Sequence, residues 1–354
     1  MDFSFHDFPR TESGMNILVT GSSGYVASRL VPALARQGHH VTGVDRENRG
    51  EAQLSRFVHG DLIEPSVVEE SLEGVSCVVH LAAAKADWGL SAAEYYRDNL
   101  DVSRALLEAG RRKGIRQWVF YSTVSAMGPS QVPIDETSGL NPIEPYGGSK
   151  AEVEKLFLHY SAATPEAGVL ILRPSVVYGP GAPASTNVFR LMDGLYRRRF
   201  VMVGDGRTVK TTSYIENLVE ATLFLMGRMD SGLSTYIYVD DPLMETGDLV
   251  KRLCRLLERR PPLVRVPLPV ASALAVPADL LARLTSVDLP ITSMRIKKFC
   301  RATVFDGGKI RREGFRQPVD NDTALARTVQ WYLTRVAGRE IPSGTLPESR
   351  GVGR

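Results

Sequence analysis

Cysteine, net charge and long hydrophobic runs are all scarce in this chain of 354 residues. Its three cysteines, Cys77, Cys254 and Cys300, are scattered without metal-site spacing, which predicts reduced thiols in a cytoplasmic protein. The six histidines form no ligand cluster, so no metal site is predicted. A formal net charge of +3 gives no basis for nucleic-acid binding. The N-terminal residues do not have the charged and then apolar form of a secretion signal.

Hydrophobic residues make up 43% of the chain and charged residues 23%, as in ordinary globular proteins. Apolar strand candidates alternate with amphipathic helix candidates up to residue 173, which predicts a parallel sheet covered on both faces. The expected strands are 16–20, 40–45, 56–59, 77–81, 117–122 and 169–173, and the expected helices are 24–37, 65–73, 91–113 and 146–163. Beyond Pro174 the pattern loosens. We therefore expect one domain at 1–175, to which 213–239 returns, a smaller lobe at 176–340 and a mobile tail at 341–354.

A glycine-rich loop follows the first expected strand. The sequence GSSGYVA at 21–27 leads into apolar residues at helical spacing, the layout that holds a dinucleotide pyrophosphate. Gly21 allows a tight turn, and Gly24 allows the backbone to approach phosphates closely. The second expected strand ends in Asp45, whose carboxylate can bind ribose hydroxyls and favours NAD. Arg46 directly after it leaves NADP as the alternative.

Tyr146 and Lys150 lie one helical turn apart on one face of an expected helix. A nearby ammonium group favours the phenolate, so such a tyrosine can act as a base near neutral pH. Tyrosine and lysine also occur at this spacing on many helices by accident. Whether this pair is catalytic therefore depends on the remainder of the chain.

Several segments occur in an order that covers nearly the whole chain. They are TGSSGYVA at 20–27, GDL at 60–62, HLAA at 80–83, Asn99, YSTVSAMG at 121–128, YGGSK at 146–150 and LRPSVVYGPG at 172–181. With them the chain resembles the extended short-chain dehydrogenases/reductases, which include nucleotide-sugar epimerases, dehydratases and decarboxylases. The resemblance implies a Rossmann-type doubly wound parallel sheet, a smaller C-terminal α/β substrate-binding lobe and NAD as cofactor.

The resemblance also assigns roles to residues of this sequence. The cofactor-binding set that it implies is Gly21, Gly24, Tyr25, Val26, Asp45, Arg46, Asp61, Leu62, Leu81, Ala82, Ala83, Asn99, Ser122, Tyr146 and Lys150. Tyr146 would remove a hydroxyl proton from a sugar while the C4 hydrogen leaves as hydride. Lys150 would lower the tyrosine pKa, and Thr123 would orient the hydroxyl. The product of this half-reaction is a 4-ketosugar.

The residues after Thr123 distinguish between reaction types. Dehydratases of this class carry Asp-Glu at the next two positions, where this chain has Val124 and Ser125. Decarboxylating relatives commonly carry Glu at the position of Ser125. Epimerisation needs no further acid, because the ketosugar turns over and receives the same hydride on its other face. The sequence therefore favours a 4-epimerase, with a dehydratase as an alternative.

The expected substrate-binding residues are Ser125, Asn187, Lys210 and Arg295. Many nucleotide-sugar enzymes carry Arg at the position of Lys210, where it contacts the diphosphate; Lys keeps the charge but lacks the bidentate fork. The basic segment around Arg295 either holds phosphates or is a solvated helix face. These segments resemble bacterial 4-epimerases of N-acetylhexosamine linked through diphosphate to undecaprenol. The predicted substrate is a small-molecule or lipid-linked sugar diphosphate.

The apolar stretch 266–282 is too short, and too interrupted by Pro and Asp279, to span a bilayer. It either packs into the lobe or lies on a membrane surface, which allows peripheral contact with the inner face of the membrane. The resemblance implies a homodimer through the helices at 91–113 and 146–163. The other classes left open are a 3β-hydroxysteroid-type dehydrogenase, which would release NADH, and a non-catalytic NAD-binding regulator.

Overall fold

The computed structural model describes residues 14–50, 53–85, 89–277, 296 and 300–338. Its largest sheet has seven strands, all parallel, in the order β12-β7-β5-β4-β1-β2-β3. These strands are β1 (Asn16–Thr20), β2 (His40–Asp45), β3 (Arg56–His59), β4 (Cys77–His80), β5 (Gln117–Tyr121), β7 (Gly168–Pro174) and β12 (Gly232–Tyr238). The predicted Rossmann-type α/β fold is confirmed.

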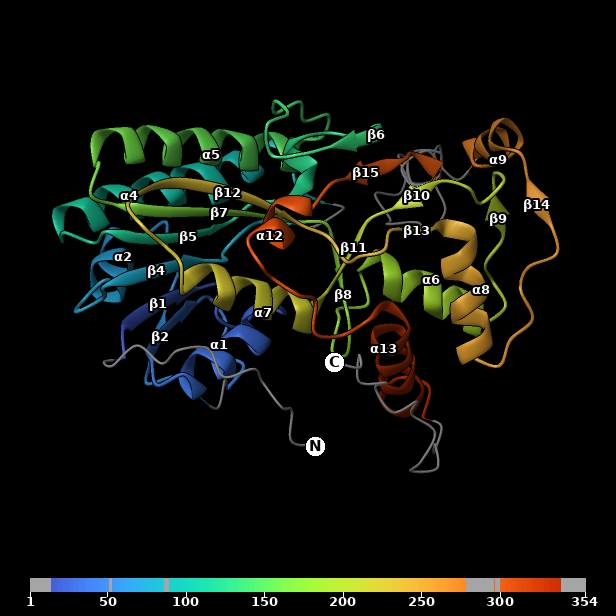
Figure 1. Cartoon of the computed structure of the whole chain (residues 1–354), viewed down its shortest axis with the longest axis horizontal. Coiled ribbons are helices and arrows are strands. Elements are labelled where there is room, and N and C mark those ends of the chain that lie inside the picture. Colours follow the sequence, from blue (N-terminus) through green and yellow to red (C-terminus); the bar gives the residue numbers. More distant parts are fainter. Residues whose placement is uncertain (1–13, 51–52, 86–88, 278–295, 297–299, 339–354) are drawn as a thin grey trace.

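Side-chain alternation along the strands gives the sheet two apolar faces. One face packs against helices α2 (Pro65–Ser71), α4 (Val102–Arg112) and α5 (Pro145–Ala163). The other packs against α1 (Ala27–Arg36), α7 (Ile215–Met226) and the short α12 (Gly308–Arg312). Figure 1 shows α4 and α5 on one side of the sheet and α1 and α7 on the other. The sheet is therefore the middle of three layers.

The order of the strands reverses between β1 and β4. Chain connections leave β1 toward β2 in one direction and pass from β4 to β5 in the other. In open parallel sheets a crevice forms at this switch point, outside the carboxyl ends of the strands. The residues that follow β1, β2, β3, β4 and β5 must therefore converge at one edge of the sheet.

A smaller lobe lies beside the sheet (Figure 1). It holds a four-stranded sheet of order β13-β10-β15-β6 and two pairs, β11-β8 and β14-β9. The strands are β6 (Ser130–Ile134), β8 (Val176–Tyr178), β9 (Met202–Val203), β10 (Val209–Lys210), β11 (Thr212–Tyr214), β13 (Met244–Glu245), β14 (Arg265–Val266) and β15 (Thr303–Phe305). Its helices are α6 (Asn187–Tyr196), α8 (Thr246–Leu256), α9 (Leu268–Leu274) and α13 (Asn321–Arg335). A separate apolar core joins α6, α8 and α13.

The expected helix at 91–113 differs from the prediction in its middle. The structure divides it into α3 (Ala92–Tyr95), a π-helical turn η1 (Tyr96–Asp101) and α4. A π turn inserts one extra residue into a helix and is frequent at functional sites. Here it carries the buried Asn99.

Candidate functional site

The glycine loop after β1 is held against the neighbouring strands. Gly21 has φ +66°, and a Cβ at this position would lie 2.9 Å from the Cα of Ala82. The amide of Gly21 donates to the carbonyl of Val44 at 2.9 Å, and the amide of Gly24 donates to the carbonyl of Gly21 at 3.0 Å. Only glycine meets both the positive φ and the close backbone contact at position 21. The loop thus lies at the switch point, beside the residues that follow β4.

Asp45 stands at the end of β2 and faces this loop. Its Oδ2 accepts a hydrogen bond from the amide of Ser23 at 3.0 Å, and its Oδ1 accepts one from the amide of Glu47 at 3.2 Å. Arg46 is exposed, with its guanidinium 3.6 Å from Asp61 and 3.8 Å from Asp98. The carboxylate of Asp45 is therefore fixed at the crevice, whereas Arg46 belongs to a loose surface cluster of charges.

The π turn connects the loop after β4 to helix α5 through Asn99. Its Oδ1 accepts from the amide of Ala84 at 2.7 Å, and its Nδ2 donates to the carbonyl of Ala84 at 3.2 Å and to Ser149 Oγ at 2.8 Å. Leu81, Ala82 and Ala83 are half-buried in the same loop. The predicted supporting position of Asn99 thus has a physical basis: its amide group joins two elements of the crevice.

A buried polar chain that the sequence did not reveal lies beneath this loop. His80 Nδ1 lies 2.7 Å from Thr20 Oγ1, and its Nε2 lies 2.9 Å from Ser103 Oγ. Ser103 donates its hydroxyl proton to the carbonyl of Asn99 at 2.5 Å, so His80 must donate from Nε2. Burial, assisted by the charge of Lys150, lowers the pKa of His80 to about 3. His80 is therefore a neutral structural link between β1, β4 and η1.

Helix α5 carries the Tyr-Lys pair and packs against the residues that follow β5. A Cβ at Gly147 would lie 2.4 Å from the carbonyl oxygen of Ser125, so the first turn of α5 lies directly on the turn η2 (Val124–Ala126). Thr123 caps η2, and its Oγ1 accepts from the amide of Ser125 at 3.1 Å. Tyr146 is half-buried, with its ring 6.2 Å from that of Tyr95. The structure thus places the turn capped by Thr123 against the start of the helix that carries Tyr146 and Lys150.

Lys150 is only 1% exposed, and its Nζ lies 4.2 Å from the centre of the Phe120 ring. Burial is the main cause that lowers the pKa of Lys150 to about 7; the charge of Glu154 opposes this shift, and the charge of Lys85 assists it. An ammonium group in this position is sensitive to any change of nearby charge. Lys150 is therefore poised between its charged and neutral forms near neutral pH.

A second feature that sequence reasoning missed is the buried ion pair of Glu154 and Arg173. The Arg173 side chain donates to Glu154 Oε2 at 2.6 Å from Nη2 and to Oε1 at 3.0 Å from Nε. Ser122 also donates to Oε1 of Glu154. Glu154 lies one turn beyond Lys150, so the helical spacing indicates that these two side chains are close, but it does not indicate the pairing with Arg173. Both oxygens of the Glu154 carboxylate therefore accept hydrogen bonds within the protein, from Arg173 and Ser122.

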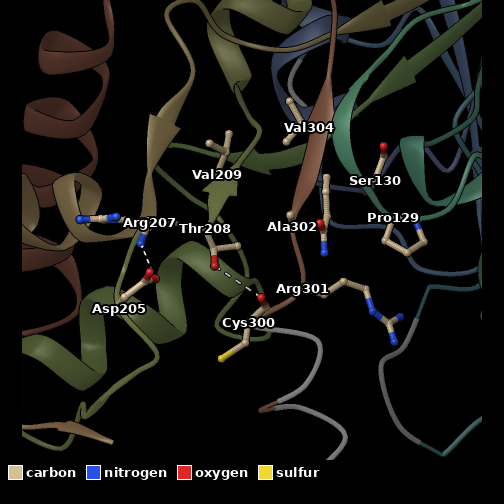
Figure 2. A pocket seen from close by; sticks show the side chains of 11 residues that line it. Pro129, Ser130, Asp205, Arg207, Thr208, Val209, Cys300, Arg301, Ala302 and Val304 are labelled. Atoms are coloured by element: carbon tan, nitrogen blue, oxygen red, sulfur yellow. Dashed lines mark hydrogen bonds between the residues drawn. The ribbon is translucent and has the colours of Figure 1, made fainter. Parts of the chain in front are cut away.

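A hollow of about 600 Å³ opens in the lobe. Figure 2 shows the side chains that line it, which come from the segments around β6, β10 and β15. Its polar lining includes Ser130, Asp205, Arg207, Thr208 and Arg301. Two of its lining residues, Pro129 and Ser130, come a few residues after Thr123 and η2 in the chain. Such a concave, partly cationic surface can accept an anionic group.

The predicted substrate residues occupy separate elements. Ser125 is exposed in η2, Asn187 is exposed at the start of α6, and Lys210 is half-buried on β10 beside the hollow. The ammonium group of Lys210 donates to the carbonyl of Arg301, whose residue lines the hollow. Arg295 lies outside the described residues.

The crevice has the features that a dinucleotide requires. A Cβ on Gly21 would fill the space against Ala82, and one on Gly24 would lie 3.0 Å from the carbonyl of Gly21. Tyr25 and Val26 follow in the turn, and Leu62 is buried beyond Asp61 at the end of β3. The predicted cofactor residues thus follow the carboxyl ends of successive strands. NAD fits the donor set because Asp45 offers a fixed carboxylate to its ribose.

Comparison with known proteins gives a consistent result. The model of the NAD dependent epimerase/dehydratase family matches residues 17–239 of this chain. The N-acetyl-alpha-D-glucosaminyl-diphospho-ditrans,octacis-undecaprenol 4-epimerase of Escherichia coli O157:H7 is 29% identical over 328 residues, covering 92% of this chain and 98% of that protein. The 4-hydroxy-2-methyl-3-oxo-4-farnesyl-3,4-dihydroquinoline-1-oxide ketoreductase of Stigmatella aurantiaca is 26% identical over 309 residues, covering 84% and 91%.

Among solved structures, MoeE5 in complex with UDP-glucose and NAD is similar, with a TM-score of 0.73 and 25% identity. The match covers 92% of this chain and 100% of that one. The resemblance found in the sequence is confirmed, and so is the expectation of an NAD-dependent enzyme.

Proposed function

Because the chain belongs to the NAD dependent epimerase/dehydratase family, we propose that it is a 4-epimerase of a sugar carried on a diphosphate. Bound NAD would supply the acceptor and the later donor of a hydride. The observation that carries the proposal is the grouping of Tyr146, Lys150 and Thr123 on α5 and the cap of η2, without a carboxylate in η2. A dehydratase needs such a group to move protons at C5 and C6.

The residues of the chain would move the proton of the C4 hydroxyl and hold the oxygen at C4 in place. Tyr146, as phenolate, would take the proton of the C4 hydroxyl while the C4 hydrogen leaves as hydride, which gives a 4-ketosugar. Lys150 would stabilise the phenolate when it is charged, and Thr123 would hold the oxygen at C4. After the sugar turns over, the hydride would return to the opposite face of C4. Tyr146 would then give its proton back to the oxygen, so the net reaction involves no oxidation.

Glu154 is a poor candidate for an additional base. Its two oxygens accept from Arg173 and Ser122, and only 4% of its side chain is exposed. Both oxygens are occupied by these partners, so Glu154 could contact a substrate only if a buried ion pair were broken. This supports epimerisation, which needs no further acid or base, over dehydration.

A lipid-linked substrate is the finer form of the proposal. It is supported by the likeness to the Escherichia coli undecaprenol-linked 4-epimerase along nearly the whole chain. The hollow beside Lys210 would receive the diphosphate, with Arg207 and Arg301 as further cations. With a lipid-linked substrate, we expect the enzyme to work at the inner face of the membrane, as a homodimer through the helices at 91–113 and 146–163.

A reductase is the second candidate, favoured by the likeness to the Stigmatella aurantiaca ketoreductase over 84% of this chain. One experiment separates the two. Purified protein with added NAD is incubated separately with UDP-N-acetylglucosamine and with undecaprenyl-diphosphate-linked N-acetylglucosamine, and the sugar stereochemistry and nicotinamide absorbance are followed. We expect conversion of the lipid-linked sugar to its 4-epimer without accumulation of reduced nicotinamide. Steadily rising absorbance with a keto product would instead establish a net dehydrogenase.

A further inference from the structure

The outer end of the lobe exposes an unusual run of large hydrophobic side chains. Among the described residues, nearly half of the exposed large hydrophobic side chains lie in one short segment, 263–276. They are Leu263, Val264, Leu268, Val270, Leu274 and Val276, here called the apolar edge. Leu263 is 97% exposed and Leu274 is 72% exposed. Single exposed hydrophobic residues are ordinary, but six of them within one segment of fourteen residues indicate a contact surface.

The apolar edge is formed by β14, α9 and the residues on either side of them. In Figure 1 these elements lie at the end of the lobe that is farthest from the seven-stranded sheet. Two alanines of α9 and its flank, Ala271 and Ala275, are buried, so the helix is anchored by its small residues. Its larger residues, Val270 and Leu274, remain outside.

Basic residues outnumber acidic ones at the apolar edge. Segment 258–277 contains Arg259, Arg260 and Arg265 and a single acid, the exposed Glu258 at its start. Arg259 donates from Nε to the carbonyl of Tyr196 at 3.0 Å, which brings it to the exposed arginine run 197–199. A basic border around apolar side chains matches the surface of an anionic lipid leaflet.

The apolar edge is joined to the hollow. Strand β14 pairs with β9, and Arg265 donates from Nη1 to the carbonyl of Asp205 at 3.1 Å. Asp205 lines the hollow. The sulfur of Cys300, another lining residue, lies 3.7 Å from the carbonyl oxygen of Val203 on β9. If the apolar edge contacts a lipid membrane, the hollow therefore lies close to the lipid headgroups.

We propose that the apolar edge docks this protein on an anionic phospholipid membrane. Leu263 and Leu274 enter the acyl-chain boundary, and Arg260 and Arg265 contact the lipid phosphates. A second copy of the chain fits less well, because a two-fold contact through this surface would bring the same arginines together. The proposal rests on the proposed function, because a diphosphate-linked lipid substrate presents its sugar at headgroup level. Within the described residues, no helix is long and apolar enough to cross a membrane.

Co-sedimentation of the full chain with vesicles tests the proposal. The vesicles contain phosphatidylglycerol and phosphatidylcholine, or phosphatidylcholine alone, and no lipid-linked sugar. We expect binding to the anionic vesicles and a loss of about tenfold in the double variant Leu263→Ser/Leu274→Ser. Arg260→Gln should bind the anionic vesicles about fivefold more weakly and leave binding to neutral vesicles unchanged. Val336→Ser, at an exposed hydrophobic residue after α13, is the matched control and should bind as the parent does.

Two further measurements keep the outcome clear. The melting temperature of each variant shows that it is folded, and epimerisation of a water-soluble substrate analogue should be equal in the parent and the Leu263→Ser/Leu274→Ser variant. Equal vesicle binding by the parent and the double variant would overturn the proposal. Failure of the parent to bind anionic vesicles would also overturn it. If the double variant instead changes a dimer to a monomer in sedimentation velocity, the surface belongs to a second copy. Vesicle binding without any sugar turnover would leave the docking surface standing and overturn the proposed function alone.

Discussion

At the scale of single residues, the site depends on how charge is balanced around a buried ammonium group. Burial lowers the pKa of Lys150 to about 7, and the charge of Lys85 acts in the same direction. Glu154 opposes this shift and is itself held by Arg173. The charge that would stabilise a Tyr146 phenolate is thus maintained by a carboxylate that does not touch the proposed substrate.

Tyr146→Phe removes the hydroxyl that is proposed to carry the proton. Turnover should fall by about 10²–10⁴-fold, the usual contribution of general acid–base catalysis, while NAD stays bound. Tyr96→Phe is the matched control, since Tyr96 is a partly exposed tyrosine of the adjacent π turn, and it should change turnover less than twofold, roughly the scatter expected for a surface site. Steady-state rates and cofactor content after gel filtration measure both effects. Full activity in Tyr146→Phe would refute the mechanism.

Glu154→Gln removes the charge that opposes the shift at Lys150 and leaves Arg173 buried without its ion pair. We expect the free energy of unfolding to fall by about 3–5 kcal/mol, because an uncompensated buried charge is costly. Glu152→Gln, which breaks only the exposed pair with Lys155 on the same helix, should cost about 0–1 kcal/mol. Urea denaturation measures all of these values.

The double variant Glu154→Gln/Arg173→Met tests the reason for that loss. Because it removes both buried charges, it should be more stable than Glu154→Gln alone. A double variant as unstable as the sum of the two single changes would show that the pair acts through packing instead.

Lys150 makes stability depend on pH in a defined direction. Its pKa is about 7 in the folded protein and near its usual value of 10.5 when unfolded. Below pH 7 both states hold the proton, so the contribution is constant; between pH 7 and 10.5 the unfolded chain holds more protons, so stability rises with pH. In Lys150→Met this rise should be absent. Denaturant midpoints across this window, compared between parent and variant, measure it, and parallel curves would contradict the assignment.

At the scale of elements, the glycine loop and β4 meet through a backbone contact that a side chain would block. In Gly21→Ala the new Cβ would lie 2.9 Å from the Cα of Ala82, and the alanine would also have to adopt a positive φ. Gly38→Ala is the matched control, because Gly38 has φ +87° but open space around its Cβ position. We expect Gly38→Ala to cost about 1–2 kcal/mol in stability with NAD affinity unchanged. Gly21→Ala should cost more and weaken NAD binding, measured by calorimetric titration; equal NAD affinity in both variants would contradict the close-contact argument.

Much of the sheet was predictable from the sequence, because buried parallel strands are short apolar runs bounded by turn residues. The six strands expected between residues 16 and 173 all occur, and because they are parallel their carboxyl ends lie at one edge of the sheet. The π turn at Asn99 was not predicted, since hydrophobic periodicity does not resolve one inserted residue in a helix. Arg173 and Glu154 were missed for another reason: their partnership joins β7 to α5, and only tertiary packing reveals it.

At the scale of the whole molecule, three features follow one another from the sheet to the outer end of the lobe. The crevice at the switch point lies beside α5, and the hollow begins beyond η2. The apolar edge is joined to the hollow through Arg265 and Asp205. These features lie in the order that the proposed substrate requires, with its sugar at one end, the diphosphate in the middle and the lipid at the other end.

The fate of the hydrogen at C4 distinguishes the proposed epimerisation from the other reactions of this family. Diphosphate-linked N-acetylglucosamine carrying deuterium at C4 is converted by the purified enzyme, and the product is analysed by mass spectrometry and NMR. Because the hydride is removed and returned to the same carbon, we predict a 4-epimer that retains deuterium at C4. Deuterium transferred to C6 would identify a dehydratase. Deuterium accumulating in reduced nicotinamide, with a keto product, would identify a dehydrogenase, and either of these results would contradict the account.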